Sequence, residues 1–146
     1  PKWVFGFGTN LNVKKWTFST TLRANIGNYM YNNVASNHGI AYNMSVNQYL
    51  SNAVSDVLSS RFINKQQMSD YYVQNASFLK MDNIGLSYNV GEVLKYKGTN
   101  LSLSANVQNV FCITKYDGLD PEIYGGIDKN IYPNPRVYTI GLNLNF

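Results

Sequence analysis

Charge is scarce in this sequence. Asp, Glu, Lys and Arg together make up 14% of its 146 residues, well below the roughly 25% of ordinary globular proteins. The formal net charge of +4 comes from scattered Lys and Arg. Because no basic run is present, we expect no nucleic-acid partner.

Cysteine and long apolar runs are also lacking. The single cysteine, Cys112, excludes an intrachain disulfide and a cysteine-based metal cluster. No apolar run approaches the ~20 residues of a membrane-spanning helix, and no stretch resembles a secretory signal. A strand-like pattern follows directly on Pro1, so we expect the chain to be a piece of a longer protein.

What the sequence does have is strict alternation of apolar and polar residues over five long segments. They are residues 3–13, 16–26, 78–90, 101–111 and 138–146. A period of two predicts long antiparallel strands, each with one apolar face. Short connections alternate with two long loops, 33–70 and 114–136, and the first of these has helical spacing at 46–62. Short turns at one end and long outer loops at the other are typical of a transmembrane β-barrel.

Two features favour a membrane wall over a soluble sheet. The polar faces carry Asn, Ser, Thr, Gly and Gln with Arg23 as the main charge, and only Lys80 and Asp82 interrupt the apolar faces. Aromatic residues gather at two levels, as they do at the two bilayer interfaces. The rings of one level are Trp3, Phe5, Phe111 and Tyr138, and those of the other are Trp16, Phe18, Tyr88 and Phe146. Since about five strands cannot close a barrel, the segment belongs to a larger one.

Three segments of the sequence resemble a known protein family. They are YYVQNASFLKMDNIGLSYNV (71–90), LSLSANVQNVFCITKYDGLDPEI (101–123) and GIDKNIYPNPRVYTIGLNLNF (126–146). Together with the opening strand pair, they resemble the C-terminal strands of the SusC/RagA family. Members of this family are TonB-linked outer-membrane transporters of Bacteroidetes.

The resemblance implies that residues 1–146 are the C-terminal portion of an all-β barrel of about 22 strands. The plug domain and the earlier strands would be absent from this chain. It also implies a place in the lipid of the cell outer membrane, a SusD-like surface lipoprotein as lid, and energy from the TonB system through the missing N-terminal part. The cargo would be oligosaccharides or peptides, with no enzymatic activity and no cofactor. The alternative is a soluble, secreted β-sandwich that binds glycan through its tyrosines.

Candidate contacts with a ligand or a lid lie in and just after the loop YDGLDPEIYGGID. They are Tyr116, Asp120, Glu122, Tyr124 and Tyr132. Carboxylates are the ligands that calcium takes, and this loop offers Asp117, Asp120, Glu122 and Asp128. Asp-Gly and Asp-Pro pairs favour turns, however, so we predict no metal site. His38, the only histidine, has no evident partner acid or nucleophile, and no catalytic site is predicted.

The last segment stays in phase to its final residue. Its apolar residues are Tyr138, Ile140, Leu142, Leu144 and Phe146. We interpret it as the closing strand of the barrel, with Phe146 at the periplasmic interface, where an aromatic ring is stable. The resemblance adds that the barrel-assembly machinery reads a terminal Phe.

Overall fold

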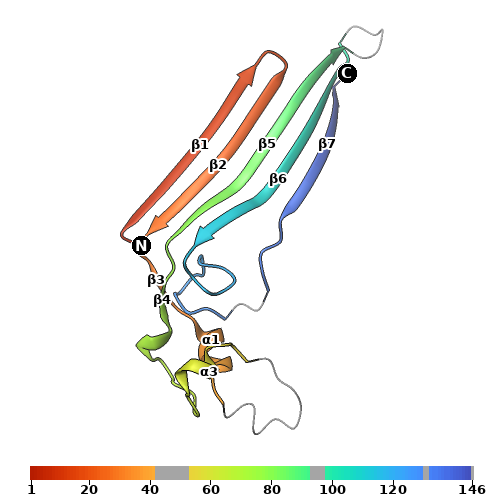
Figure 1. Ribbon diagram of the computed structural model, residues 1–146. Coiled ribbons are helices and arrows are strands. Elements are labelled where there is room, and N and C mark those ends of the chain that lie inside the picture. Colours follow the sequence, from red (N-terminus) through yellow and green to blue (C-terminus); the bar gives the residue numbers. More distant parts are fainter. Residues whose placement is uncertain (42–52, 93–97, 130–131, 146) are drawn as a thin grey trace. The chain divides into compact units, whose positions relative to one another are not determined.

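Strands dominate the computed structural model of the chain, which describes residues 1–41, 53–92, 98–129 and 132–145 (Figure 1). The chain divides into two units. The sheet unit contains Lys2–Ile26, Phe78–Ile113 and Asn134–Phe146, and the loop unit contains Pro1, Gly27–Ser77 and Thr114–Pro133. The long strands belong to the first and the short elements to the second, which confirms the all-β prediction.

Five long strands form the sheet unit in the order β1-β2-β5-β6-β7. Their bounds are β1 Trp3–Val13, β2 Trp16–Ile26, β5 Phe78–Glu92, β6 Asn100–Thr114 and β7 Val137–Asn145. The β1–β2, β2–β5 and β6–β7 ladders are antiparallel, and the arrows of β5 and β6 also run in opposite directions (Figure 1). Long strands that follow one another in the chain are therefore neighbours in the sheet, as the alternating pattern predicts.

The register of these ladders brings apolar side chains together on one face. In the first ladder Phe7 lies opposite Leu22, and in the last Leu103 lies opposite Leu142. Residues that face each other across a ladder point to the same side of the sheet. Much of this apolar surface is open, and Ile140 is 87% exposed. An apolar face of this kind suits hydrocarbon rather than water.

Small polar residues occupy the opposite face. A Cβ placed on Gly85 of β5 would lie 2.5 Å from Ser19 Oγ of β2 and 3.4 Å from Asn106 Oδ1 of β6. A Cβ on Gly141 of β7 would lie 2.6 Å from Ser104 Oγ of β6. These close approaches show that the polar residues of four strands share one side of the sheet.

A bulge interrupts the β2–β5 ladder. Thr21 pairs with Asn83, whereas the next residue, Leu22, pairs with Met81. Asp82 is therefore the extra residue of β5. An extra residue of this kind bends the strand and shifts the alternation by one position.

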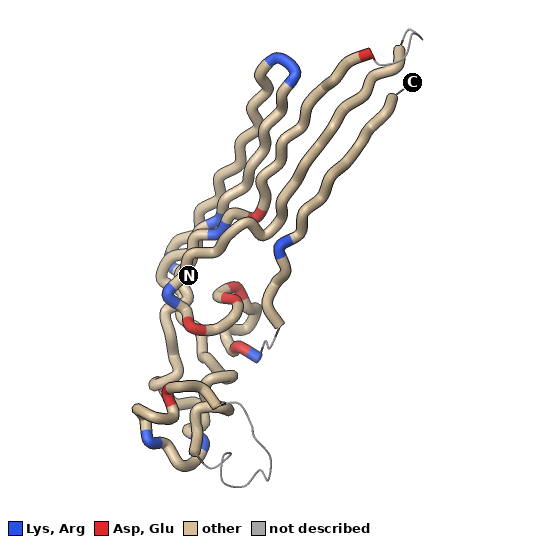
Figure 2. Tube along the Cα trace, turned by 45° about the vertical axis from the view of Figure 1, so that its right-hand side comes forward, with Lys and Arg blue, Asp and Glu red and all other residues tan. Residues whose placement is uncertain are grey.

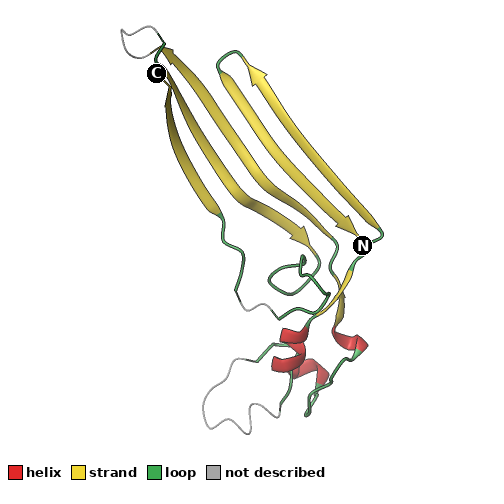
Figure 3. Cartoon of the chain, turned by 180° about the vertical axis from the view of Figure 1, so that it is seen from behind, coloured by secondary structure: helices red, strands yellow, loops and turns green. Residues whose placement is uncertain are grey.

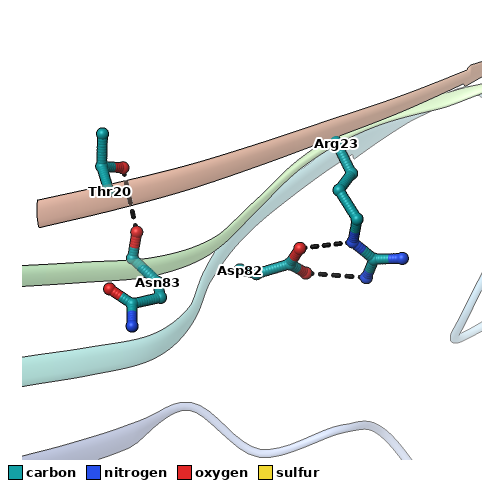
Figure 4. A network of polar contacts seen from close by, with 4 residues as sticks. All are labelled: Thr20, Arg23, Asp82 and Asn83. Carbon is teal, nitrogen blue, oxygen red and sulfur yellow. Dashed lines mark hydrogen bonds and ion pairs between the residues drawn. The ribbon is translucent and has the colours of Figure 1, made fainter. Parts of the chain in front are cut away.

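The bulge corrects the position expected for Lys80. Uninterrupted alternation placed Lys80 and Asp82 on the apolar face, but beyond the bulge Lys80 lies opposite Arg23, on the polar side. The guanidinium of Arg23 donates two hydrogen bonds to the carboxylate of Asp82 (Figure 4). The bond from Nη2 to Oδ1 measures 2.8 Å. Next to this pair, Thr20 Oγ1 donates to the backbone carbonyl of Asn83 at 2.9 Å (Figure 4). The apolar face of this ladder is thereby relieved of both charges.

Aromatic and basic residues meet at the β1–β2 turn. The rings of Trp16 and Tyr88 lie opposite each other, with centroids 4.5 Å apart, as the prediction of an aromatic level at the short turns requires. The turn itself is Lys14 and Lys15, visible as a basic tip in Figure 2. Lys15 Nζ donates to the carbonyl of Val90 at 3.1 Å. Phe146 lies outside the described residues, so its role in assembly stays a prediction.

In its described residues the loop unit contains only short elements (Figure 3). They are β3 Tyr29–Tyr31, α1 Asn33–His38, α3 Val57–Ser60, the 3-10 turn η1 Asp70–Tyr72, and β4 Val73–Asn75. Of the helix predicted within 46–62, the structure places α3 in its second half, while residues 42–52 lie outside the described part. Within the described ranges, no helix is both long and apolar enough to cross a membrane.

An Arg substitution distinguishes the two faces of the sheet. Leu103→Arg should destabilise the full-length barrel by about 2–4 kcal/mol, because it places a cation on the lipid side near the midplane. Asn106→Arg, on the polar side of the same strand, should cost much less. Both variants would be compared by denaturant unfolding in lipid vesicles. Equal losses for the two variants would contradict the assignment of the faces.

The Arg23–Asp82 pair should show measurable coupling. Because the two side chains are 41% and 25% exposed, solvent screening limits the coupling to about 1 kcal/mol. Arg23→Gln, Asp82→Asn and the double variant would be unfolded in denaturant to obtain a double-mutant cycle. The double variant should be more stable than the sum of the single losses predicts. Strictly additive losses would show that the pair does not stabilise the bulge.

Candidate functional site

Backbone pairing holds the two long segments of the loop unit together. Strands β3 and β4 pair with Tyr31 opposite Val73. The amide of Tyr31 also donates to the carbonyl of Gly126 at 2.8 Å, and its carbonyl accepts from the amide of Asp128 at 2.9 Å. These two bonds join the strand that leads into the predicted loop 33–70 to the predicted loop 114–136, and residues of both loops belong to the loop unit.

Tyr116 and Asp128 form a buried pair inside this unit. The hydroxyl of Tyr116 donates to Asp128 Oδ2 at 2.6 Å, and only 1% of Asp128 is exposed. Burial, followed by the hydrogen bond to this carboxylate, raises the pKa of Tyr116 far above its ordinary value. A Cβ on Gly118 would lie 2.6 Å from Asp128 Oδ2, so the backbone passes close over the pair. Tyr116 therefore packs within the unit and contacts the small core around Met30.

The other predicted contact residues lie in different environments. Tyr124 and Tyr132 are exposed, whereas Asp120 is buried. Asp120 Oδ1 accepts a hydrogen bond from the amide of Glu122 at 2.9 Å, which is the turn geometry predicted for Asp-Pro. In the part of the chain that the structure describes, no three His, Cys, Asp or Glu side chains are grouped to hold a metal ion. Contact of the five residues with a ligand or a lid stays a prediction.

A pocket of about 840 Å³ lies within the loop unit. This volume is in the range of small-molecule sites. Its walls come from α1 with its N-cap, from the residues just before α3, from η1 and β4 themselves, and from the turn at 117–119. The lining residues are Asn32, Val34, Ala35, Val54, Ser55, Asp56, Tyr71, Tyr72, Gln74, Asp117, Gly118, Leu119 and Asp128.

Hydrogen bonds fix several of the lining side chains. Gln74 Nε2 donates to Asp117 Oδ2 at 3.1 Å, and the amide of Asp117 donates back to Gln74 Oε1 at 3.2 Å. The hydroxyl of Tyr71 donates to Asp56 Oδ1 at 3.0 Å. The side chain of Asn32 caps α1 by accepting from the amide of Ala35 at 2.8 Å. Much of the wall is therefore held in place before any ligand arrives.

The electrostatics of this pocket are negative. Asp56, Asp117 and Asp128 line it, and its lining contains no Lys or Arg among the described residues. The hydrogen bond to Asp56 raises the pKa of Tyr71, with smaller contributions from burial and from the charge of Asp56. Burial raises the pKa of Tyr72, and the charge of Asp56 adds to it. The carboxylate of Asp56 therefore contributes to both shifts, and burial is the larger cause for Tyr72.

Sequence reasoning found only part of this pocket. It singled out Asp117 and Asp128, which stand in a turn-rich loop. It missed Asp56, which comes from a stretch that has neither a strand period nor a family pattern. It also missed Tyr71 and Gln74, which lie at the start of a family-like segment but carry no chemistry that would single them out. The adjacent tyrosines at 71 and 72 were the one local signal, and nothing in the sequence placed them beside Asp117.

No family model matches the chain. Among curated proteins, the TonB-dependent receptor SusC of Bacteroides thetaiotaomicron is 39% identical over 98% of this chain. The TonB-dependent receptor P3 of Formosa agariphila is 24% identical over all of it. The chain spans 15% and 16% of the length of these two relatives.

Solved structures of related transporters are also similar to the chain. A structure of the RagAB peptide transporter superposes with a TM-score of 0.72 and 25% sequence identity, covering 97% of this chain and 17% of that one. The RagAB peptide importer in its 'closed-closed' state gives a TM-score of 0.73, again at 25% identity, covering 98% of this chain and 17% of that one. The sheet has one apolar and one polar face, and these relatives match the chain over nearly its whole length. The chain belongs to the SusC/RagA family of TonB-dependent outer-membrane β-barrel proteins.

Proposed function

We propose that this chain is the C-terminal wall segment of a transporter that imports oligosaccharides or peptides together with a SusD-like surface lipoprotein. The observation that carries the proposal is the 39% identity to SusC over 98% of the chain. The chain spans only 15–17% of the length of its relatives, so the plug and the remaining strands would come from other parts of a longer protein. Contact with the TonB system would come from those parts too.

The sheet unit has the two faces that such a wall needs. Its apolar face would meet lipid and its polar face the lumen. Strands β1 and β7 lie at the two ends of the strand order. In lipid their outer backbone groups must be paired, which neighbouring strands of the complete barrel would do. The alternative of a soluble, secreted β-sandwich has no support from these relatives.

We further propose that the loop unit faces the cell exterior and the Lys14–Lys15 turn faces the periplasm. Outer-membrane barrels have short periplasmic turns and longer extracellular loops, and the segments 33–70 and 114–136 are the long ones here. An outward position would let the loop unit meet cargo or the lipoprotein. The peptide class is supported by the similarity to the RagAB peptide transporter, and the oligosaccharide class by the resemblance of the sequence to the family.

Cysteine labelling on intact cells tests the orientation. In a Cys112→Ser background, needed because Cys112 is exposed, Leu58→Cys and Tyr124→Cys should react with a membrane-impermeant maleimide. Their native side chains are 82% and 104% exposed. Lys15→Cys should react only after the outer membrane is disrupted, and all three should label in lysed cells. Labelling of Lys15→Cys on intact cells, with protection of the other two, would reverse the proposed orientation.

Cargo and partner are tested in the organism that makes the protein. Full-length protein purified from outer membranes in detergent should bring a surface lipoprotein with it. Deletion of the gene should abolish growth on the oligosaccharide or peptide that is imported and leave growth on glucose unchanged. Purification without a lipoprotein, combined with normal growth on oligosaccharide and peptide sources, would contradict the proposal.

A further inference from the structure

The pocket of the loop unit has an unusual balance of charge. Asp56 and Asp117 contribute carboxylates to its lining, the buried Asp128 lies behind them in its pair with Tyr116, and the lining described by the structure contains no Lys or Arg. The chain as a whole carries a net charge of +4, so the negative pocket does not simply follow from an acidic protein. An anionic ligand would be repelled here, and a cationic one attracted.

Neutral donors hold two of these carboxylates without compensating their charge. Asp56 accepts from the hydroxyl of Tyr71, and also from the hydroxyl of Ser59 at 2.9 Å. Asp117 accepts from the side-chain amide of Gln74. Such bonds fix the position of each carboxylate but do not neutralise its charge. The site is therefore preorganised for a ligand that carries a positive charge.

Aromatic rings stand beside these carboxylates. Tyr71 and Tyr72 both line the pocket. Their ring centroids are 5.1 Å apart and the ring planes meet at 84°. The ring of Tyr71 is 50% exposed, whereas Tyr72 is 2% exposed, and its hydroxyl has no hydrogen-bond partner within the described part of the chain. The faces of such rings attract a cation within about 6 Å of the centroid. Tyr71 is also joined to Asp56, so an aromatic surface and a carboxylate belong to the same part of the wall.

We propose that this pocket binds a cationic group, an ammonium or a guanidinium, carried by the ligand. The inference rests on the proposed function and deepens it, because it names the chemical class of cargo that the loop unit accepts. Asp56 and Asp117 supply the charge, and the exposed ring of Tyr71 supplies the flat apolar contact. The same ammonium chemistry can come from a peptide or from an amino sugar, and both sources can be tested.

Binding to the purified full-length transporter tests the inference. Trilysine and a trimer of glucosamine would be titrated by calorimetry, each beside its N-acetylated form as a neutral control. Asp56→Asn and Asp117→Asn are matched variants, since each retains the carbonyl oxygen that accepts the observed hydrogen bond and loses only the charge. Asp70→Asn removes a carboxylate from the same unit outside the pocket lining. Heat-modifiable mobility on a gel would show that each variant is folded.

Saturable binding of trilysine should weaken about tenfold in Asp56→Asn and in Asp117→Asn, the change expected for the loss of one nearby charge. Asp70→Asn should bind like the wild type, the acetylated forms should bind far more weakly, and added salt should weaken binding. Binding of the glucosamine trimer as well would show that either source of the amine is accepted. No saturable binding of trilysine, equal binding of its acetylated form, or unchanged affinity in both pocket variants would overturn the inference. Growth and lipoprotein co-purification report separately on the proposed function, so the two failures can be told apart.

Discussion

Register between neighbouring strands is the constraint on which the rest of this structure depends. A sheet that separates lipid from a wet lumen needs its apolar side chains on one side at every ladder, because a shift of one residue moves them all to the other side. The pairs Phe7–Leu22 and Leu103–Leu142 satisfy this requirement in the first and last ladders. The backbone of every strand in lipid must also be paired, so a wall of this kind becomes stable only as part of a closed ring.

The polar face is shaped by close contacts between small residues. Gly85 lies against Ser19 and Asn106, and Gly141 against Ser104. These side chains are short, and Ser104 Oγ donates to the carbonyl of Gly141 at 3.4 Å. A Cβ at either position would come within 2.6 Å of a serine hydroxyl oxygen, so that serine would have to turn away. The face keeps its polar character with few charges, which explains how so little charge suffices for a protein with one wet side.

Sequence reasoning could predict the strands because alternation is local. The segments 3–13 and 16–26 match β1 and β2, and the rings of Trp16 and Tyr88 meet as the aromatic levels predict. The bulge at Asp82 could not be predicted, because it depends on how two strands distant in the chain pair with each other. The pocket could not be predicted from the sequence for a related reason.

The pocket forms only where residues from two loops meet, and no period in either loop records that meeting. Asp56 and Asp117 line the same pocket although the whole of β5 and β6 lies between them in the chain. The environment of a single loop residue was equally hard to foresee. The sequence suggested Tyr116 as a contact for a ligand or a lid. In the structure its hydroxyl donates to Asp128, and both side chains are buried.

The bulge in the β2–β5 ladder also bears on how faithfully the strands find their partners. A slip of one residue would turn Asp82 toward hydrocarbon, and a slip of two would keep the faces but remove its carboxylate from Arg23. Only the native alignment gives the extra residue its place and the aspartate its guanidinium. After a one-residue slip of this ladder the carboxylate would face lipid, where an unpaired charge is costly, and after a two-residue slip it would only lose its ion pair on the polar side. The bulge residue Asp82 therefore favours the native register of this ladder over slips of one and of two residues.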